Sequence, residues 1–126
     1  MAGPEILLVD DERDILELGL LALREAGYEV QPASNGDIAL VLMEQGLGFR
    51  LLITDVVMPG VLDGYALARR AREIDPDLRI LYTTGFSHVA AIRSPGAPKG
   101  DVLLKPWKPS DLLRAVGMVM SADARN

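Results

Sequence analysis

Five short apolar runs are spread along the chain, and helical patterns fill most of the intervals between them. Four of the runs are almost continuously apolar, as in strands that are covered on both faces, and the second alternates like a half-buried strand. The predicted strands lie at residues 5–10, 28–31, 51–55, 79–83 and 101–105. Each run is too short to form a stable helix, so this alternation constrains the fold strongly.

Apolar residues recur at helical spacing in the intervals, with a Gly or Pro close to several of the expected helix ends. We expect helices at about 12–26, 38–46, 67–74 and 109–120, whereas the interval 85–100 offers only a brief patch at 89–92. Strands that alternate with helices predict parallel strands joined by right-handed crossovers, with helices on both faces of the sheet. The predicted fold class is therefore a three-layer α/β domain.

The size and composition favour one acidic globular domain. The chain has 126 residues, of which 49% are hydrophobic and 25% are charged, and its net charge is −5. We expect a single domain over 1–126, with its core at about 5–120 and a tail at 121–126. A basic stripe is absent from the sequence, which argues against direct binding of nucleic acid.

The sequence also bears on location. Cysteine is absent, which excludes disulfides and thiolate metal sites. The sequence has neither an apolar run of the roughly 20 residues needed to span a bilayer nor a recognisable signal peptide at Met1. We therefore expect a cytoplasmic protein that does not bind membranes.

Polar residues stand where four of the predicted strands end. The first strand ends in Asp10-Asp11, the third in Asp55, the fourth in Thr83-Thr84-Gly85 and the fifth in Lys105-Pro106. Ligands of open parallel sheets bind beyond the carboxyl ends of the strands, so these side chains should share one edge. Crowded carboxylates repel one another unless a cation joins them, and a hard ion such as Mg²⁺ suits oxygen ligands.

Such a cluster suits phosphoryl transfer. A carboxylate such as Asp55 can attack phosphorus and form an aspartyl phosphate. The transition state needs positioned cations and hydrogen-bond donors more than it needs an acid or a base. Lys105 would supply positive charge and Thr84 a hydroxyl group, while backbone N–H groups after Asp55 would complete the cradle. As a simpler interpretation, Asp10 and Asp11 could cap the first helix.

Four motifs together resemble response-regulator receiver domains. They are Leu8-Val9-Asp10-Asp11-Glu12, Asp55-Val56-Val57-Met58-Pro59-Gly60, Tyr82-Thr83-Thr84-Gly85 and Leu104-Lys105-Pro106-Trp107. The resemblance extends from Glu5 to about Met120. It implies a flavodoxin-like (CheY-like) fold with five parallel strands in the order 2-1-3-4-5.

The resemblance also implies a phosphoacceptor and its metal ligands. Asp55 would receive a phosphoryl group from a histidine kinase or a histidine phosphotransfer protein. Asp11 and Asp55 would bind Mg²⁺ (or Mn²⁺) directly, Asp10 would act largely through water, and Val57 would contribute its backbone carbonyl. The chain would be a switch rather than a turnover enzyme.

The remaining implied roles concern the switch itself. Lys105 would pair with the phosphoryl group, and the bond from Lys105 to Pro106 would be cis. Thr84 would turn toward the phosphoryl group and couple it to an output face at about 87–120, used by a protein partner or a second copy. We assign this role to Thr84 rather than Thr83 because a small residue, Gly85, follows it, as in the family.

The sequence departs from the family pattern at several positions. Val102 stands where many members have a switching Tyr or Phe, so this aromatic switch is missing. The loop at 59–64 is one residue longer than usual, which resembles the receivers of hybrid sensor kinases, although Met1 favours a free-standing regulator. Val57 and Phe86 are apolar and cannot orient a hydrolytic water, so we expect slow autodephosphorylation.

Other functions fit the sequence less well. A phosphatase of the haloacid dehalogenase type needs an acid two residues after its nucleophile, and this chain has Val57 there. A flavin or nucleotide binder needs a Gly- or Ser-rich loop after the first strand. A degenerate receiver that only binds partners would not need the complete charged set.

Three further features have simple structural interpretations. We interpret Trp107 as a packing residue, His88 as a loop residue, and Arg69-Arg70-Ala71-Arg72 as a solvated helix face.

Overall fold

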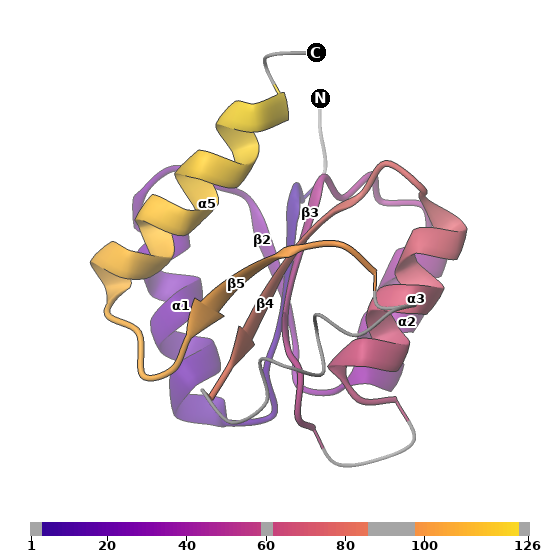
Figure 1. The fold of residues 1–126 in the computed structure, drawn as a ribbon, viewed down its shortest axis with the longest axis horizontal. Coiled ribbons are helices and arrows are strands. Elements are labelled where there is room, and N and C mark those ends of the chain that lie inside the picture. The colour runs from indigo at the N-terminus through magenta and orange to yellow at the C-terminus, as the bar shows by residue number, and fades with distance from the viewer. Residues whose placement is uncertain (1–3, 59–61, 86–97, 124–126) are drawn as a thin grey trace.

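Five parallel strands form a single sheet in the order β2-β1-β3-β4-β5, with helices on both faces (Figure 1). The computed structural model describes residues 4–58, 62–85 and 98–123. The strands are β1 (Ile6–Val9), β2 (Val30–Ala33), β3 (Leu51–Asp55), β4 (Arg79–Thr84) and β5 (Asp101–Leu104). The described helices are α1 (Arg13–Glu25), α2 (Gly36–Glu44), α3 (Gly64–Ile74) and α5 (Pro109–Asp123). The predicted fold class and strand order are confirmed.

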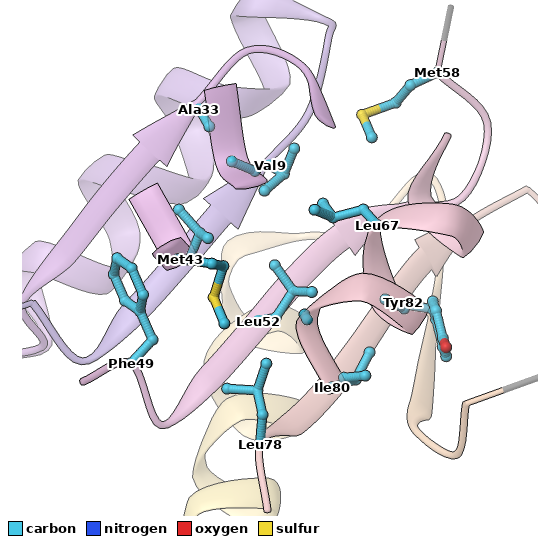
Figure 2. Packing of buried hydrophobic residues seen from close by; sticks show 14 of the residues in the cluster. Val9, Ala33, Met43, Phe49, Leu52, Met58, Leu67, Leu78, Ile80 and Tyr82 are labelled. Atoms are coloured by element: carbon cyan, nitrogen blue, oxygen red, sulfur yellow. The ribbon is translucent and has the colours of Figure 1, made fainter. Parts of the chain in front are cut away.

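The two faces of the sheet carry separate apolar clusters, because successive side chains of a strand point to opposite faces. In β1, Leu7 and Val9 pack on the side of α2 and α3, whereas Ile6 and Leu8 pack on the side of α1 and α5. Figure 2 shows part of the α2 and α3 side, where Leu52 of β3 lies at the centre of the packed side chains. These strand side chains are almost completely buried, as expected for a sheet covered on both faces.

The second strand lies two residues later than the sequence predicted. The prediction placed it at 28–31, but β2 runs from Val30 to Ala33 and includes Pro32. Proline is disfavoured inside a sheet because it lacks an N–H group, but β2 is an edge strand and needs ladder bonds on one side only. Tyr28 instead belongs to the turn after α1, where its N–H donates to the carbonyl of Leu23 at 3.1 Å.

Side-chain caps explain two helix starts that lie ahead of the predicted ones. The Asn35 side chain accepts from the N–H of Ile38 at 2.8 Å and begins α2. The Asp63 side chain accepts from the N–H of Ala66 at 2.8 Å and begins α3. Both Asn and Asp are preferred at this position because they satisfy an unpaired backbone donor.

The last helix is longer than the sequence predicted. Helix α5 continues to Asp123, three residues past its expected end at Met120 and into the expected tail. The helical patch expected at 89–92 lies outside the described residues. Within the part of the chain that the structure describes, each helix is too short or too polar to cross a membrane.

Candidate functional site: an acidic cluster around Lys105

The ends of β1, β3 and β5 bring the predicted site residues together. Val9 lies beside Thr54 in the parallel register of β1 and β3, so the next residues, Asp10 and Asp55, lie at the same edge of the sheet. Lys105 directly follows β5, and its N–H donates to the carbonyl of Thr84 on β4 at 2.9 Å. Three segments that are distant in sequence thus supply one site.

Three carboxylates stand close enough to share a cation. One oxygen from each of Asp10, Asp11 and Asp55 lies within 4.8 Å of the other two. Asp10 and Asp55 are buried, with 3% and 5% of their surface exposed, and Asp11 is exposed. Carboxylate oxygens at this spacing are a donor set that a hard divalent cation prefers, and the exposed Asp11 leaves an approach from solvent. The residues present therefore fit a metal ion.

The ammonium group of Lys105 lies among carboxylates from two strand ends and the start of α1. Its Nζ lies 2.9 Å from Asp55 Oδ2, 3.1 Å from Asp10 Oδ2 and 3.3 Å from Glu12 Oε1. The Lys105 side chain is 16% exposed, so little water screens the two buried pairs. The geometry places positive charge directly beside Asp55.

Burial and pairing shift the pKa values of this cluster. Burial raises the pKa of Asp10, and this outweighs the opposing effects of the Glu12 N–H and of Lys105. For Lys105, burial alone would lower the pKa, but hydrogen bonds to Asp55 and Asp10 raise it above the ordinary value. Both groups thus bind protons more tightly than in water, Asp10 because it is buried and Lys105 because carboxylates surround its ammonium group.

Thr84 has a buried hydroxyl group that is available for a ligand. Its Oγ1 is buried and makes no hydrogen bond within the described residues. A buried polar atom without a partner is uncommon and costs free energy, so it often belongs to a site that another group completes. Thr83 is also buried, but among the described residues Thr84 Oγ1 is the one buried side-chain polar atom without a hydrogen-bond partner.

The chain after Asp55 is folded back against the strand end. Val57 donates its N–H to Asp55 Oδ1 at 3.3 Å, which holds the carboxylate, and the N–H of Gly64 donates to the carbonyl of Val56 at 3.0 Å. A Cβ on Gly64 would overlap the carbonyl oxygen of Asp55, so the first turn of α3 can come this close only because residue 64 has no side chain. Val57 itself is half exposed.

Two contacts of the site were not predicted from the sequence. Glu12 was recognised only as part of a motif, but its side chain reaches Lys105. Gly64 was treated as part of a loop, but it fixes the distance between α3 and Asp55. The position of Glu12 directly after Asp10-Asp11 was an available signal, since a long acidic side chain there starts at the same sheet edge.

The structure also describes a peptide bond and two side chains that were singled out from the sequence. The bond between Lys105 and Pro106 is cis. Trp107 packs against the α1 and α5 cluster, which confirms it as a packing residue. Arg69 lies over the ring of Tyr65, 4.8 Å from its centre. The positions predicted for Phe86 and His88 lie outside the described residues.

The fold and the acidic edge together define the class of protein. The family model of the response regulator receiver domain matches residues 6–117. The chain therefore belongs to the response regulator receiver domain family, and it is a CheY-like receiver domain of two-component signalling.

The chain is also similar to individual receiver proteins and to part of a sensor kinase. The chain is 42% identical over 118 residues to the response regulator receiver protein CpdR of Brucella abortus, covering 93% of this chain and 97% of CpdR. It is 35% identical over 113 residues to the sensor kinase CckA of the same organism, covering 88% of this chain but 12% of CckA. A solved response regulator receiver protein from Sinorhizobium medicae has a TM-score of 0.86 at 33% identity, covering 95% of this chain and 96% of that structure.

Proposed function

We propose that Asp55 is the phosphoacceptor of this receiver domain. One observation carries the proposal: the buried Asp55 carboxylate lies 2.9 Å from the Lys105 ammonium and within ligand-sharing distance of two further carboxylates. A carboxylate oxygen of Asp55 attacks phosphorus, and the bond from phosphorus to the nitrogen of a phosphohistidine breaks. The imidazole leaves with the electron pair, so the number of phosphoryl groups is conserved.

The residues around Asp55 have separate tasks in this proposal. Asp10, Asp11 and Asp55, with the Val57 carbonyl, would hold Mg²⁺ or Mn²⁺. When bound, the ion neutralises charge that develops on the phosphoryl oxygens. Lys105 contributes a second positive charge, 2.9 Å from Asp55 Oδ2.

The phosphoryl donor would be a protein. Two-component receivers take the group from a histidine kinase or a histidine phosphotransfer protein, and the similarity to part of the sensor kinase CckA is consistent with such a partner. The chain itself would act in the cytoplasm as a switch, without turnover of a substrate and without direct contact with nucleic acid.

The output would follow from Thr84. Its unpartnered hydroxyl is free to turn toward a phosphoryl group on Asp55, which would move the end of β4 and the surface beyond it. A downstream protein or a second copy would read the surface at about 87–120, of which 98–120 are described. Apolar Val57 beside the acceptor supports slow loss of the phosphoryl group.

The test is the mass of the intact protein after incubation with acetyl phosphate and Mg²⁺. We expect wild type to gain one phosphoryl group, and Asp55→Asn or chelation of the metal to abolish the gain. Asp101→Asn is the matched control, since Asp101 is exposed at the opposite end of the sheet and should leave the reaction unchanged. A gain in Asp55→Asn equal to that of wild type would place the acceptor elsewhere.

A further inference from the structure

The three hydrogen-bond donors of the Lys105 ammonium face three carboxylates. A lysine ammonium has three N–H donors and no acceptor. The carboxylates of Asp55, Asp10 and Glu12 stand at 2.9, 3.1 and 3.3 Å from Nζ, one for each donor. A phosphoryl group that approaches Asp55, while Asp55 is still a carboxylate, therefore meets a lysine whose donors are already engaged, and one of the present contacts has to yield.

Glu12 is the partner that Lys105 can release most easily. Its side chain is 60% exposed, whereas those of Asp10 and Asp55 are 4% and 7% exposed. A released Glu12 carboxylate is solvated by water at once, but a released buried carboxylate stays without compensation. Glu12 also makes the longest of the three contacts.

The position of Glu12 has no competing structural explanation in helix capping. Glu12 is the N-cap residue of α1, but among the described residues its side chain makes no capping hydrogen bond to the helix. Its backbone N–H donates to Asp10 Oδ1 at 2.9 Å, which fixes the residue beside the site. Ser, Thr, Asp and Asn are the residues that cap well, and the longer Glu instead reaches across to Lys105.

We infer that Glu12 occupies the place of the phosphoryl group on Lys105 in the unphosphorylated protein and opposes phosphorylation. The inference rests on the proposed function of Asp55. Glu12 holds the third donor of Lys105 until a phosphoryl oxygen displaces it, and the carboxylate then turns into solvent. Glu12 is thus a positioning residue that acts through Lys105, and it favours the unphosphorylated state.

Two substitutions at residue 12 separate the contact from its charge. Glu12→Gln keeps the length and removes the charge, and Glu12→Asp keeps the charge but is too short to make the same contact. Both should raise the rate of phosphorylation by acetyl phosphate at saturating Mg²⁺ by about two- to fivefold, as expected for loss of one partly exposed ion pair. Glu17→Gln is the matched control, because Glu17 is an exposed acid of α1 that pairs with Arg13.

Binding of a phosphoryl mimic gives a second readout that a purely structural role would not change. In Mg²⁺, beryllofluoride should bind both Glu12 variants more tightly than wild type by about the same two- to fivefold factor. The fluorescence of Trp107, the single tryptophan, reports this binding, because Trp107 lies two residues after Lys105. Thermal melting of each variant checks that it is folded.

The outcomes separate the two proposals. If Glu12→Asp behaves as wild type while Glu12→Gln is phosphorylated faster, the negative charge of residue 12 explains the effect without a contact to Lys105, and the inference is wrong. It is also wrong if both variants are slower or unchanged while wild type is phosphorylated on Asp55. If wild type gains no phosphoryl group and binds no beryllofluoride, the proposed function itself fails, and the role of Glu12 fails with it.

Discussion

The middle of the sheet and its carboxyl edge differ completely in composition, although the same strands form both. In β1 the change takes one residue, from Val9, packed among apolar side chains, to Asp10, a buried carboxylate that faces Lys105. In β3, Leu52 is fully buried in an apolar cluster, and three residues later Asp55 enters the acidic group. The middle of the sheet supplies stability, and the edge supplies a charged site.

The comparison shows that burial has opposite consequences in the two regions. Removing apolar surface from water stabilises the middle of the sheet. At the edge, burial raises the pKa of Asp10, which means that the charged carboxylate is less stable there than in water despite its contact with Lys105. The edge therefore keeps charges together for binding at a cost in folding free energy.

The largest expected effect comes from a cavity in the middle of the sheet. Leu52→Ala should lower the free energy of unfolding by about 2–5 kcal/mol, because it removes a fully buried side chain from a packed cluster. Urea denaturation measures the change. Leu21→Ala on α1 is the control, since Leu21 is 58% exposed and its loss should stay within about 0.5 kcal/mol. Equal losses at the two positions would contradict the contrast between packed and exposed apolar residues.

An intermediate effect is expected where the two regions meet. Gly64→Ala places a methyl group against the carbonyl of Asp55, so the first turn of α3 has to shift. We expect a loss of about 1–3 kcal/mol in unfolding free energy. The rate of Asp55 phosphorylation should fall as well, measured by intact mass at a temperature where the variant is folded.

Another helical glycine provides the control for that substitution. Among the described residues, no atom outside the chain neighbours of Gly117 and the adjacent backbone of α5 lies within 4 Å of a Cβ built on this glycine. Gly117→Ala should therefore stabilise the protein by about 0.5–1 kcal/mol, because alanine loses less conformational freedom in a helix. If Gly64→Ala also stabilised the protein, the close approach of α3 to Asp55 would not require a residue without a side chain at position 64.

Apart from the two control substitutions, the smallest predicted effect is a gain in stability at the edge. In EDTA near pH 7, Asp10→Asn should raise the free energy of unfolding by on the order of 1 kcal/mol, because it removes a buried carboxylate while Lys105 keeps Asp55 and Glu12. Thermal and urea denaturation would measure the difference. The same substitution should lower the affinity for Mg²⁺. Asp10 would then be shown to favour metal binding while it reduces the stability of the fold.

The pH dependence of this difference has a definite sign. The folded protein raises the pKa of Asp10 above 3.8, its ordinary value, so folding favours the protonated form. The contribution of Asp10 to stability is therefore fully present below pH 3.8 and is lost as the pH rises through the raised value. The gain in unfolding free energy from Asp10→Asn should therefore be present at pH values above the raised pKa of Asp10 and absent below pH 3.8. An advantage that grew toward acid pH would contradict the raised pKa.

Most of the fold could be predicted from the sequence because its signals are local. The runs at 51–55 and 79–83 are apolar enough to identify strands without knowledge of their neighbours, and β3 has the predicted bounds. The second strand was misplaced because Pro32 argues against a strand unless that strand is known to lie at an edge. Edge position is a property of the assembled sheet, so local patterns could not supply it.

The site could be predicted in part for a related reason. Asp10, Asp55 and Lys105 each end a predicted strand, and parallel strands end at a common edge, so their convergence was predictable from the sequence. The position of Glu12 after Asp10-Asp11 placed it near this edge, but its contact with Lys105 depends on the direction of a long side chain, which the sequence does not define.

The sequence by itself determined the alternation of strands and helices and which residue types end each strand, since these follow from backbone periodicity and from burial of apolar runs. Only the tertiary structure decided which carboxylates share the Lys105 ammonium, that Thr84 keeps an unpartnered buried hydroxyl, and that Gly64 lies against Asp55. The physical reason is that contact distances and solvent exposure arise from packing between elements, and no single segment contains that information.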